Sequence, residues 1–263
     1  MKNLNIYEFL KSLQGQKIKY VPNGGNAGDD LIAYATLQIF RELKLDFEMC
    51  VPWDQFNGDL LIYGGGGSLI HNYTFSREFL ERNYKHNKII VLPHTVNCHH
   101  DVLNKLPANT TIITREETSY NYVKKHMNHP ENVFISDDMA FHTKGVELYK
   151  EEKGIGECNA FRLDSERTNI KVPENNKDVS TDFMCCVKWM SPEQRIDVSS
   201  DNLFSYLCKF NEINTNRLHI SIAGALLGKK VNFYPNSYYK NKAVFDFSMK
   251  KEFSNVNFID IRN

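Results

Sequence analysis

Short apolar runs alternate with amphipathic stretches along the first half of the chain. The apolar runs are KIKYV (17–21), DLLIY (59–63), KIIVL (88–92), TTIIT (110–114) and NVFIS (132–136). Between them, residues 31–43, 75–84 and 117–126 repeat their apolar positions with helical spacing. Strands that recur about every 20–25 residues with helices between them predict a parallel, doubly wound sheet.

Each of these predicted strands ends in a polar or glycine-rich loop. The loops are PNGGNAGDD (22–30), GGGGS (64–68), PHT (93–95), RE (115–116) and DD (137–138). Since ligands of open α/β sheets bind outside the carboxyl ends of the strands, we expect the five loops to converge on one crevice. The four glycines let backbone N–H groups approach a ligand closely, although a tight turn without a ligand is the alternative. They form neither a P-loop nor a complete Gly-x-Gly-x-x-Gly motif.

The second half begins after a candidate linker. Residues 144–157 are charged, contain three glycines and lack a sustained apolar face. We therefore place one domain over residues 1–147 and another over residues 148–263. In the second domain the pattern predicts a strand and loop at 158–167, a loop at 169–180, a helix at about 201–210 and a strand at 231–234.

The segment NRLHISIAGALLGKKV (216–231) predicts a helix that precedes the last of these strands. Asn216 is a good N-cap residue, the apolar positions after it repeat with helical spacing, and Gly228 ends the helix. Free N–H groups at such a helix start favour an anion, and Arg217 and His219 add two cationic side chains there. Taken alone, these residues also fit a surface ion pair and an ordinary helix histidine.

Composition sets limits on the partners. The chain has 263 residues, 41% apolar content and 32 basic against 32 acidic residues. Zero formal net charge gives no indication of a nucleic-acid partner, so any anion preference must be local. No apolar run reaches the roughly 18 residues of a membrane span. We therefore expect a cytoplasmic protein that is at most peripheral to the inner face of the membrane.

The cysteines indicate neither a disulfide framework nor a metal site. None of the six forms a Cys-x-x-Cys pair, and the adjacent Cys185 and Cys186 do not readily bridge each other. Cys98 lies beside His99 and His100, but no second cluster at ligand spacing accompanies them. We expect reduced thiols and no structural metal.

The order of the motifs resembles the polysaccharide pyruvyl transferase family. The motifs are NAGDDLI, GGGGSL, LPHT, TRE and NRLHISIAGALLGKKV followed by SYYKNKA, and they extend over residues 17–247. The resemblance implies two Rossmann-like domains in an arrangement like that of the GT-B glycosyltransferases, with the site in the cleft between them. It also implies transfer of a pyruvyl group from phosphoenolpyruvate to two sugar hydroxyls as a cyclic ketal. Residues 165–200 are hard to align, which leaves the acceptor side of the second domain undefined.

The resemblance assigns donor-binding roles to residues of both domains. Arg217, Leu218 and His219 match the family's donor-contacting Arg-Leu-His, and Arg115 matches a second arginine in the N-terminal domain. Each arginine can bind one anionic group of phosphoenolpyruvate through its fork. The further donor-binding candidates are Gly65, Gly66, Ser68 and Lys242, with Lys240 beside the last. Phosphoenolpyruvate is expected as the donor substrate, without a cofactor.

Ketal formation requires an acid and a base. His219 is the candidate acid, and His94 is an independent candidate. Asp29 or Asp30 is the candidate base, with one of the two capping the helix that begins near Leu31. The alternates for the base are Asp137 and Asp138, and the acceptor-binding candidates are Asn26, Asp29 and Asp138.

Two other functions stay open at this point. One is a nucleotide-sugar-dependent GT-B glycosyltransferase, against which the absence of a Glu-rich ribose-binding motif after residue 231 counts. The other is a non-catalytic protein that binds a glycan or serves as an assembly partner. The acceptor is expected to be a glycan or a lipid-linked saccharide, but the sequence specifies neither its sugar and linkage nor the oligomeric state.

Overall fold

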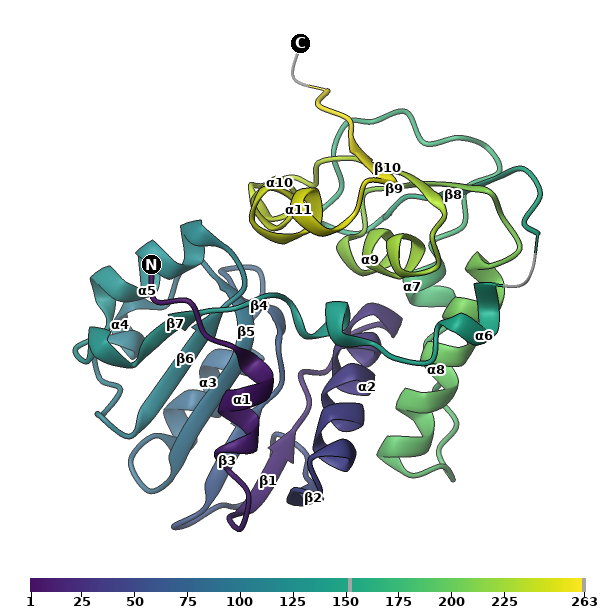
Figure 1. The fold of residues 1–263 in the computed structure, drawn as a ribbon. Coiled ribbons are helices and arrows are strands. Elements are labelled where there is room, and N and C mark those ends of the chain that lie inside the picture. Colours follow the sequence, from purple (N-terminus) through teal and green to yellow (C-terminus); the bar gives the residue numbers. More distant parts are fainter. Residues whose placement is uncertain (151–152, 262–263) are drawn as a thin grey trace. The chain divides into compact units, whose positions relative to one another are not determined.

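In the computed structural model, which describes residues 1–150 and 153–261, the apolar runs of the first half form one parallel sheet (Figure 1). Its strand order is β2-β1-β3-β5-β6-β7, and β4 pairs with β5. The register aligns Ile18 of β1 with Phe47 of β2 and Leu60 of β3. The strands are β1 (Lys17–Val21), β2 (Asp46–Met49), β3 (Leu60–Tyr63), β4 (Gly66–Leu69), β5 (Lys88–Val96), β6 (Thr110–Thr114) and β7 (Val133–Ile135).

The five predicted strands are confirmed, and two further strands were missed. β2 alternates exposed and half-buried residues at the edge of the sheet, so it has no apolar run to mark it. β4 lies within the glycine stretch, where strand propensity is low. Its pairing with β5 shows that the glycines continue the sheet beyond β3.

Helices at the predicted positions accompany this sheet. α5 packs against β5, β6 and β7, and the N-terminal segment lies beside β7 through a bridge between Asn3 and Ile135. The elements are α1 (Ile6–Lys11), α2 (Ala27–Glu42), α3 (Phe75–Asn83), α4 (His100–Leu103), α5 (Glu117–His126), η1 (Pro130–Asn132) and η2 (Met139–His142).

The chain divides into two compact units. The first unit contains residues 1–24 and 35–139, and the second contains residues 25–34 and 140–263. The division after Met139 precedes the boundary predicted from sequence, and the grouping of residues 25–34 with the second unit has no counterpart in that prediction. The start of α2 therefore belongs with the second unit. The predicted linker includes α6 (Glu147–Lys150), and its residues 151 and 152 lie outside the described part of the chain.

The second unit has its own parallel sheet, with strand order β11-β10-β9-β8. Its strands are β8 (Glu157–Ala160), β9 (Glu212–Thr215), β10 (Lys230–Phe233) and β11 (Val256–Phe258). Its helices are α6, α7 (Val179–Asp182), α8 (Pro192–Leu207), α9 (Leu218–Leu226), α10 (Lys240–Val244), the π-helical η3 (Phe245–Met249) and α11 (Lys250–Glu252). Parallel strands joined through helices make this unit Rossmann-like as well.

α9 packs closely on the sheet of the second unit. A Cβ atom added at Gly224 would lie 2.7 Å from Cδ1 of Ile213 on β9 and 3.0 Å from Cγ2 of Val231 on β10. The absence of a side chain at Gly224 thus sets the distance between α9 and both strands. Among the described residues, no helix has the length and apolar content to span a membrane.

The helix predicted near residues 201–210 is the end of a longer helix. α8 begins at Pro192, where Ser191 and Gln194 form a capping box. The motif Ser-Pro-Glu-Gln carries this start signal in the sequence, but the prediction overlooked it. β9 and β11 were also missed, since each is short and polar at alternate positions.

Candidate functional site

The segment that enters α9 confirms a helix start at the predicted place, with one correction. The N-cap is Arg217 and not Asn216. The side chain of Asn216 is committed elsewhere, because its Oδ1 accepts a hydrogen bond of 2.8 Å from the backbone N–H of Arg162. Thr215 Oγ1 accepts from the Arg217 N–H instead. At the other end, Gly228 has a φ of +72° just after the C-cap, so its role in ending the helix is confirmed.

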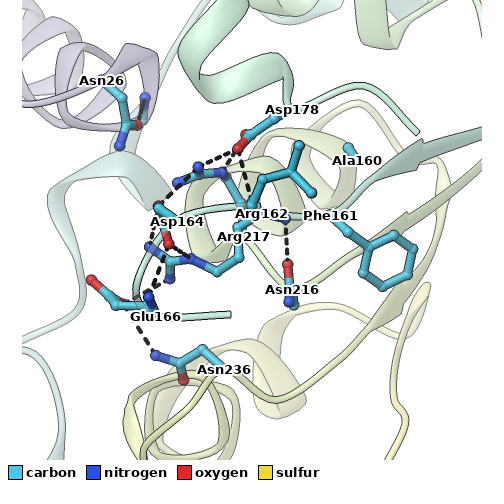
Figure 2. A network of polar contacts seen from close by, with 12 residues as sticks. Asn26, Ala160, Phe161, Arg162, Asp164, Glu166, Asp178, Asn216, Arg217 and Asn236 are labelled. Atoms are coloured by element: carbon cyan, nitrogen blue, oxygen red, sulfur yellow. Dashed lines mark hydrogen bonds and ion pairs between the residues drawn. The ribbon is translucent and has the colours of Figure 1, made fainter. Parts of the chain in front are cut away.

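Arg217 lies in a chain of alternating charges whose members are largely buried, apart from the exposed Asp164 (Figure 2). Asp178 accepts from Nε and Nη2 of Arg217 at 2.5 and 2.6 Å. Asp164 lies 3.0 Å from Nη2 of Arg217 and also accepts two hydrogen bonds from Arg162. Arg162 in turn donates to Glu166 at 2.7 Å. We call the series Asp178–Arg217–Asp164–Arg162–Glu166–Lys240 the charge chain.

Lys240 and Asn236 complete the far end of the charge chain. Oε2 of Glu166 accepts from Lys240 Nζ at 2.6 Å and from Asn236 Nδ2 at 3.2 Å. Burial by itself would raise the pKa of Glu166, but the charges of Lys240 and Arg162 outweigh it and lower that pKa to about 2. The Glu166 carboxyl therefore stays ionised near neutral pH, and the charge chain contains three basic and three acidic residues.

The charge chain was not predicted as a site, although the sequence carries a signal for it. In the loop after β8, charged residues occur at alternate positions: Arg162, Asp164 and Glu166. The first and last of these are at least nine-tenths buried. Charged residues are rarely buried unless they are paired, so the contacts and not the spacing reveal their role.

The start of α2 lies against His219 within the second unit. A Cβ added at Gly28 would lie 2.6 Å from Nδ1 and 2.9 Å from Cβ of His219. Asn26 is the residue before the helix, and its Oδ1 accepts from the Gly28 N–H at 2.8 Å. Asp29 returns a hydrogen bond by accepting from the Asn26 N–H at 3.0 Å. Asn26 therefore caps α2, in place of the predicted Asp29 or Asp30.

Asp30 has the environment of a weak base. Burial raises the pKa of Asp30 to about 6, and a hydrogen bond from Ser199 of α8 and the charge of Arg195 only partly oppose this effect. Asp29 adds to the rise through its negative charge. A carboxylate with a pKa near 6 suits proton transfer at neutral pH.

In the first unit, the loop after β1 meets the glycine stretch after β3. A Cβ at Gly64 would lie only 2.5 Å from the backbone N of Asn23, so this approach requires glycine. Oδ1 of Asn23 accepts from Ser68 Oγ at 2.6 Å and from the Tyr63 hydroxyl at 3.1 Å. β1 and β3 are where the strand order reverses, which is the usual ligand position in such sheets.

His94 and Arg115 lie buried beside this loop. Nε2 of His94 accepts from the Ser68 N–H at 3.0 Å, which assigns the ring proton to Nδ1. Burial, and to a smaller extent the charge of Arg115, lower the pKa of His94 to about 3. Arg115 donates to Asp138 at 2.6 Å and to Thr95 at 2.9 Å. His94 is therefore neutral at physiological pH.

The structure thus gathers the predicted residues into two groups. In the first unit Gly65 and Gly66 are buried beside Ser68, His94, Arg115 and Asp138. In the second unit Arg217, Leu218 and His219 are grouped with Asn26, Asp29 and Asp30. Lys242 lies apart from the charge chain, since it pairs with Asp246 one turn along its own helical segment. Among residues 1–150 and 153–261, no group of three or more potential ligands could hold a metal.

Parallel sheets with polar strand ends, and a buried arginine at the start of a helix in the second sheet, define an α/β protein with candidate anion sites. The model of the polysaccharide pyruvyl transferase family matches residues 26–238, and the chain belongs to this family. Membership makes it an enzyme of the pyruvyl transferase class.

A solved structure is similar over the whole chain. It is the crystal structure of a functionally uncharacterised protein from Klebsiella pneumoniae, with 32% sequence identity and a TM-score of 0.81. The match covers 98% of this chain and 99% of the other. A search of curated proteins gives no significant match.

Proposed function

We propose that this enzyme transfers a pyruvyl group from phosphoenolpyruvate to two hydroxyls of a sugar in a cell-surface polysaccharide or exopolysaccharide, with formation of a cyclic ketal. The observation that carries the proposal is Arg217 at the start of α9, with His219 two residues later, in a chain of this family. Arg217 is a buried cation at a helix start, where the helix dipole also favours negative charge, and this environment suits an anionic donor.

The reaction can be written with the residues of the second unit. A proton adds to the methylene carbon of phosphoenolpyruvate while a sugar hydroxyl attacks the carbon that bears the phosphate. Phosphate leaves, and the second hydroxyl attacks the same carbon to close the ketal. The two hydroxyls release two protons in total: one balances the proton added to the new methyl group, and the other leaves with phosphate.

We assign these proton transfers to His219 and Asp30. His219 is the acid, since it lies in the first turn of α9, two residues after Arg217. Asp30 is the base, because its raised pKa allows it to accept a proton near neutral pH. Asp29 is engaged with the cap of α2, so its place is in acceptor binding beside Asn26. On this assignment kcat/KM falls below a pH of about 6 and Asp30→Asn removes most of the activity.

The first unit enters the proposal through Arg115 and Asp138. Their pair at the end of β6 is proposed to contact the substrates as well. His94 is buried, and its pKa of about 3 leaves it without an acidic proton near neutral pH, so we do not assign it the role of the acid. Its proposed role is to hold the backbone of Ser68 in place. The location proposed for the enzyme is the cytoplasm or the inner face of the membrane, where lipid-linked acceptors are made.

The test is a transfer assay. The purified protein is incubated with phosphoenolpyruvate and a panel of lipid-linked or aryl galactosides and N-acetylmannosaminides, and products are read by mass spectrometry. A mass gain of one pyruvyl group, lost in Arg217→Ala, supports the proposal. Thermal protection by uridine or guanosine diphosphate but not by phosphoenolpyruvate would instead indicate a nucleotide-sugar enzyme.

Hydrogen exchange tests the part played by the two units. Phosphoenolpyruvate together with an accepted sugar is expected to slow exchange in peptides around Arg217 and in peptides around Arg115. Protection confined to the second unit would remove Arg115 from the site.

A further inference from the structure

Asp178 stands out because it is held in place from several sides. It is the N-cap of α7, where its carbonyl accepts from the N–H groups of Thr181 and Asp182. The preceding residue, Lys177, donates its N–H to the carbonyl of Asn159 on β8. The Asp178 carboxylate also accepts from the Leu163 N–H at 3.3 Å. The backbone and the side chain of Asp178 are therefore both anchored to the β8 end of the sheet.

The anchored carboxylate covers one edge of the Arg217 guanidinium. Its two oxygens bind Nε and Nη2, which is the side-on, two-bond geometry of the strong arginine–carboxylate pairs. Both side chains are largely buried, at 6% exposure for Arg217 and 11% for Asp178. Figure 2 shows Asp178 and Asp164 on the guanidinium of Arg217.

This arrangement leaves one part of the guanidinium available. Within the part of the chain that the structure describes, Nη1 of Arg217 donates no hydrogen bond, whereas Nε and Nη2 both bind Asp178. The planar fork of arginine cannot rotate Nε and Nη2 toward a ligand without breaking the pair with Asp178. A donor that meets this geometry contacts Nη1.

We infer that Asp178 is a positioning residue for donor binding: it fixes the guanidinium of Arg217 so that Nη1 is presented to the anionic group of phosphoenolpyruvate. The inference rests on the proposed function, in which Arg217 binds the donor. It assigns a role to a residue of the predicted loop at 169–180, which the sequence left without one. It also means that Arg217 contacts the donor through one nitrogen and not through its whole fork.

The test compares Asp178→Asn with the wild type and with a matched control. Asparagine keeps the size of the side chain but loses the charge and one acceptor. We expect the KM for phosphoenolpyruvate to rise about 10- to 100-fold, with a smaller change in kcat and with partial recovery in Asp178→Glu. Asp182→Asn, in the same short helix but exposed and outside the charge chain, is expected to behave as the wild type.

A double-mutant cycle separates this role from a general effect on folding. In an Arg217→Ala background, Asp178→Asn is expected to change the dissociation constant of phosphoenolpyruvate no further, because its effect passes through Arg217. An unchanged KM in Asp178→Asn would overturn the inference. A lowered KM would overturn it as well, because Asp178 would then compete with the donor for Arg217.

The contact between Asp178 and Arg217 can also be tested without substrate, by the solvent exchange of the Arg217 Nε–H group. The Nε–H signal of Arg217, assigned with Arg217→Lys in ¹⁵N NMR spectra, is expected to be protected from solvent exchange in the wild type and to lose that protection in Asp178→Asn. If the wild type neither binds nor uses phosphoenolpyruvate, the proposed function fails, and this signal still decides whether Asp178 positions Arg217. Equal protection in both proteins refutes the positioning role.

Discussion

Substitution of Glu166 by glutamine tests whether the charge chain stabilises the second unit as its geometry indicates. The Glu166 side chain is 4% exposed, and one of its oxygens accepts from Arg162, Lys240 and Asn236. Glu166→Gln keeps the shape but removes the negative charge that Lys240 and Arg162 share, while Arg162 keeps its pair with Asp164. Removing one partner of a buried ion pair costs about 3–5 kcal/mol, so we expect a loss of this order at pH 7.

The pKa of Glu166 sets how this loss depends on pH. The folded pKa, about 2, lies below the ordinary value of 4.5. A carboxyl whose pKa is lower in the folded chain stabilises that chain when the pH is above the pKa of the unfolded chain. This stabilisation is lost as the pH falls toward the pKa of the folded chain. The shift corresponds to about 3 kcal/mol at pH 7, of which about 1.4 kcal/mol remains at pH 3. The stability gap between wild type and Glu166→Gln should therefore narrow by about 2 kcal/mol from pH 7 to pH 3.

Urea unfolding followed by circular dichroism at both pH values measures the two gaps. Because the comparison is a difference of differences, the titration of carboxylates outside the charge chain cancels. Glu174→Gln is the control, since Glu174 is an exposed carboxylate in the loop before Asp178, and it should leave stability unchanged at both pH values. A gap of equal size at pH 7 and pH 3 would refute the reasoning.

Three further substitutions test other contacts. Gly224→Ala places a Cβ 2.7 Å from Ile213 Cδ1 and should lower the free energy of unfolding by about 1–3 kcal/mol in urea titrations. Gly28→Ala drives a Cβ into the ring of His219 and should lower the transfer rate up to about 100-fold while the helix itself stays formed. The third is His94→Gln: because His94 is buried neutral with a pKa of about 3, the unfolded chain takes up a proton below pH 6.5 and the wild type loses stability as pH falls. Between pH 7 and pH 5 this loss is about 2 kcal/mol, and His94→Gln should lack it.

The controls and contrary outcomes for these three are direct. Gly24→Ala introduces a Cβ with no atom within 4 Å and should be neutral in both glycine experiments. Gly224→Ala with wild-type stability would mean that α9 moves away from the sheet freely. An unchanged transfer rate in Gly28→Ala would show that His219 takes no part in the reaction. If His94→Gln still lost stability between pH 7 and pH 5, the titration of His94 would not be the cause of that loss.

Local patterns in the sequence were sufficient for the elements that bury a continuous apolar surface. The five strands of the first sheet and the helices α3 and α5 lie where periodicity placed them, since burial selects apolar residues at a regular spacing. The strands β2, β9 and β11 escaped because each is short and carries polar residues on one side. Their pairing partners, which are distant in sequence, make them strands.

The sequence by itself determined the class of protein, the strand-end loops and the placement of Arg217 and His219 at a helix start. The loops and the helix start follow from the spacing of residues close together in the sequence, and the order of the motifs identified the family. Only the tertiary structure decided what these side chains touch. Asp178 reaches Arg217 across 39 residues and Lys240 reaches Glu166 across 74. The grouping of Gly28 with His219 and the neutral state of His94 likewise depend on packing, because burial and neighbouring charge are properties of the folded chain and not of local sequence.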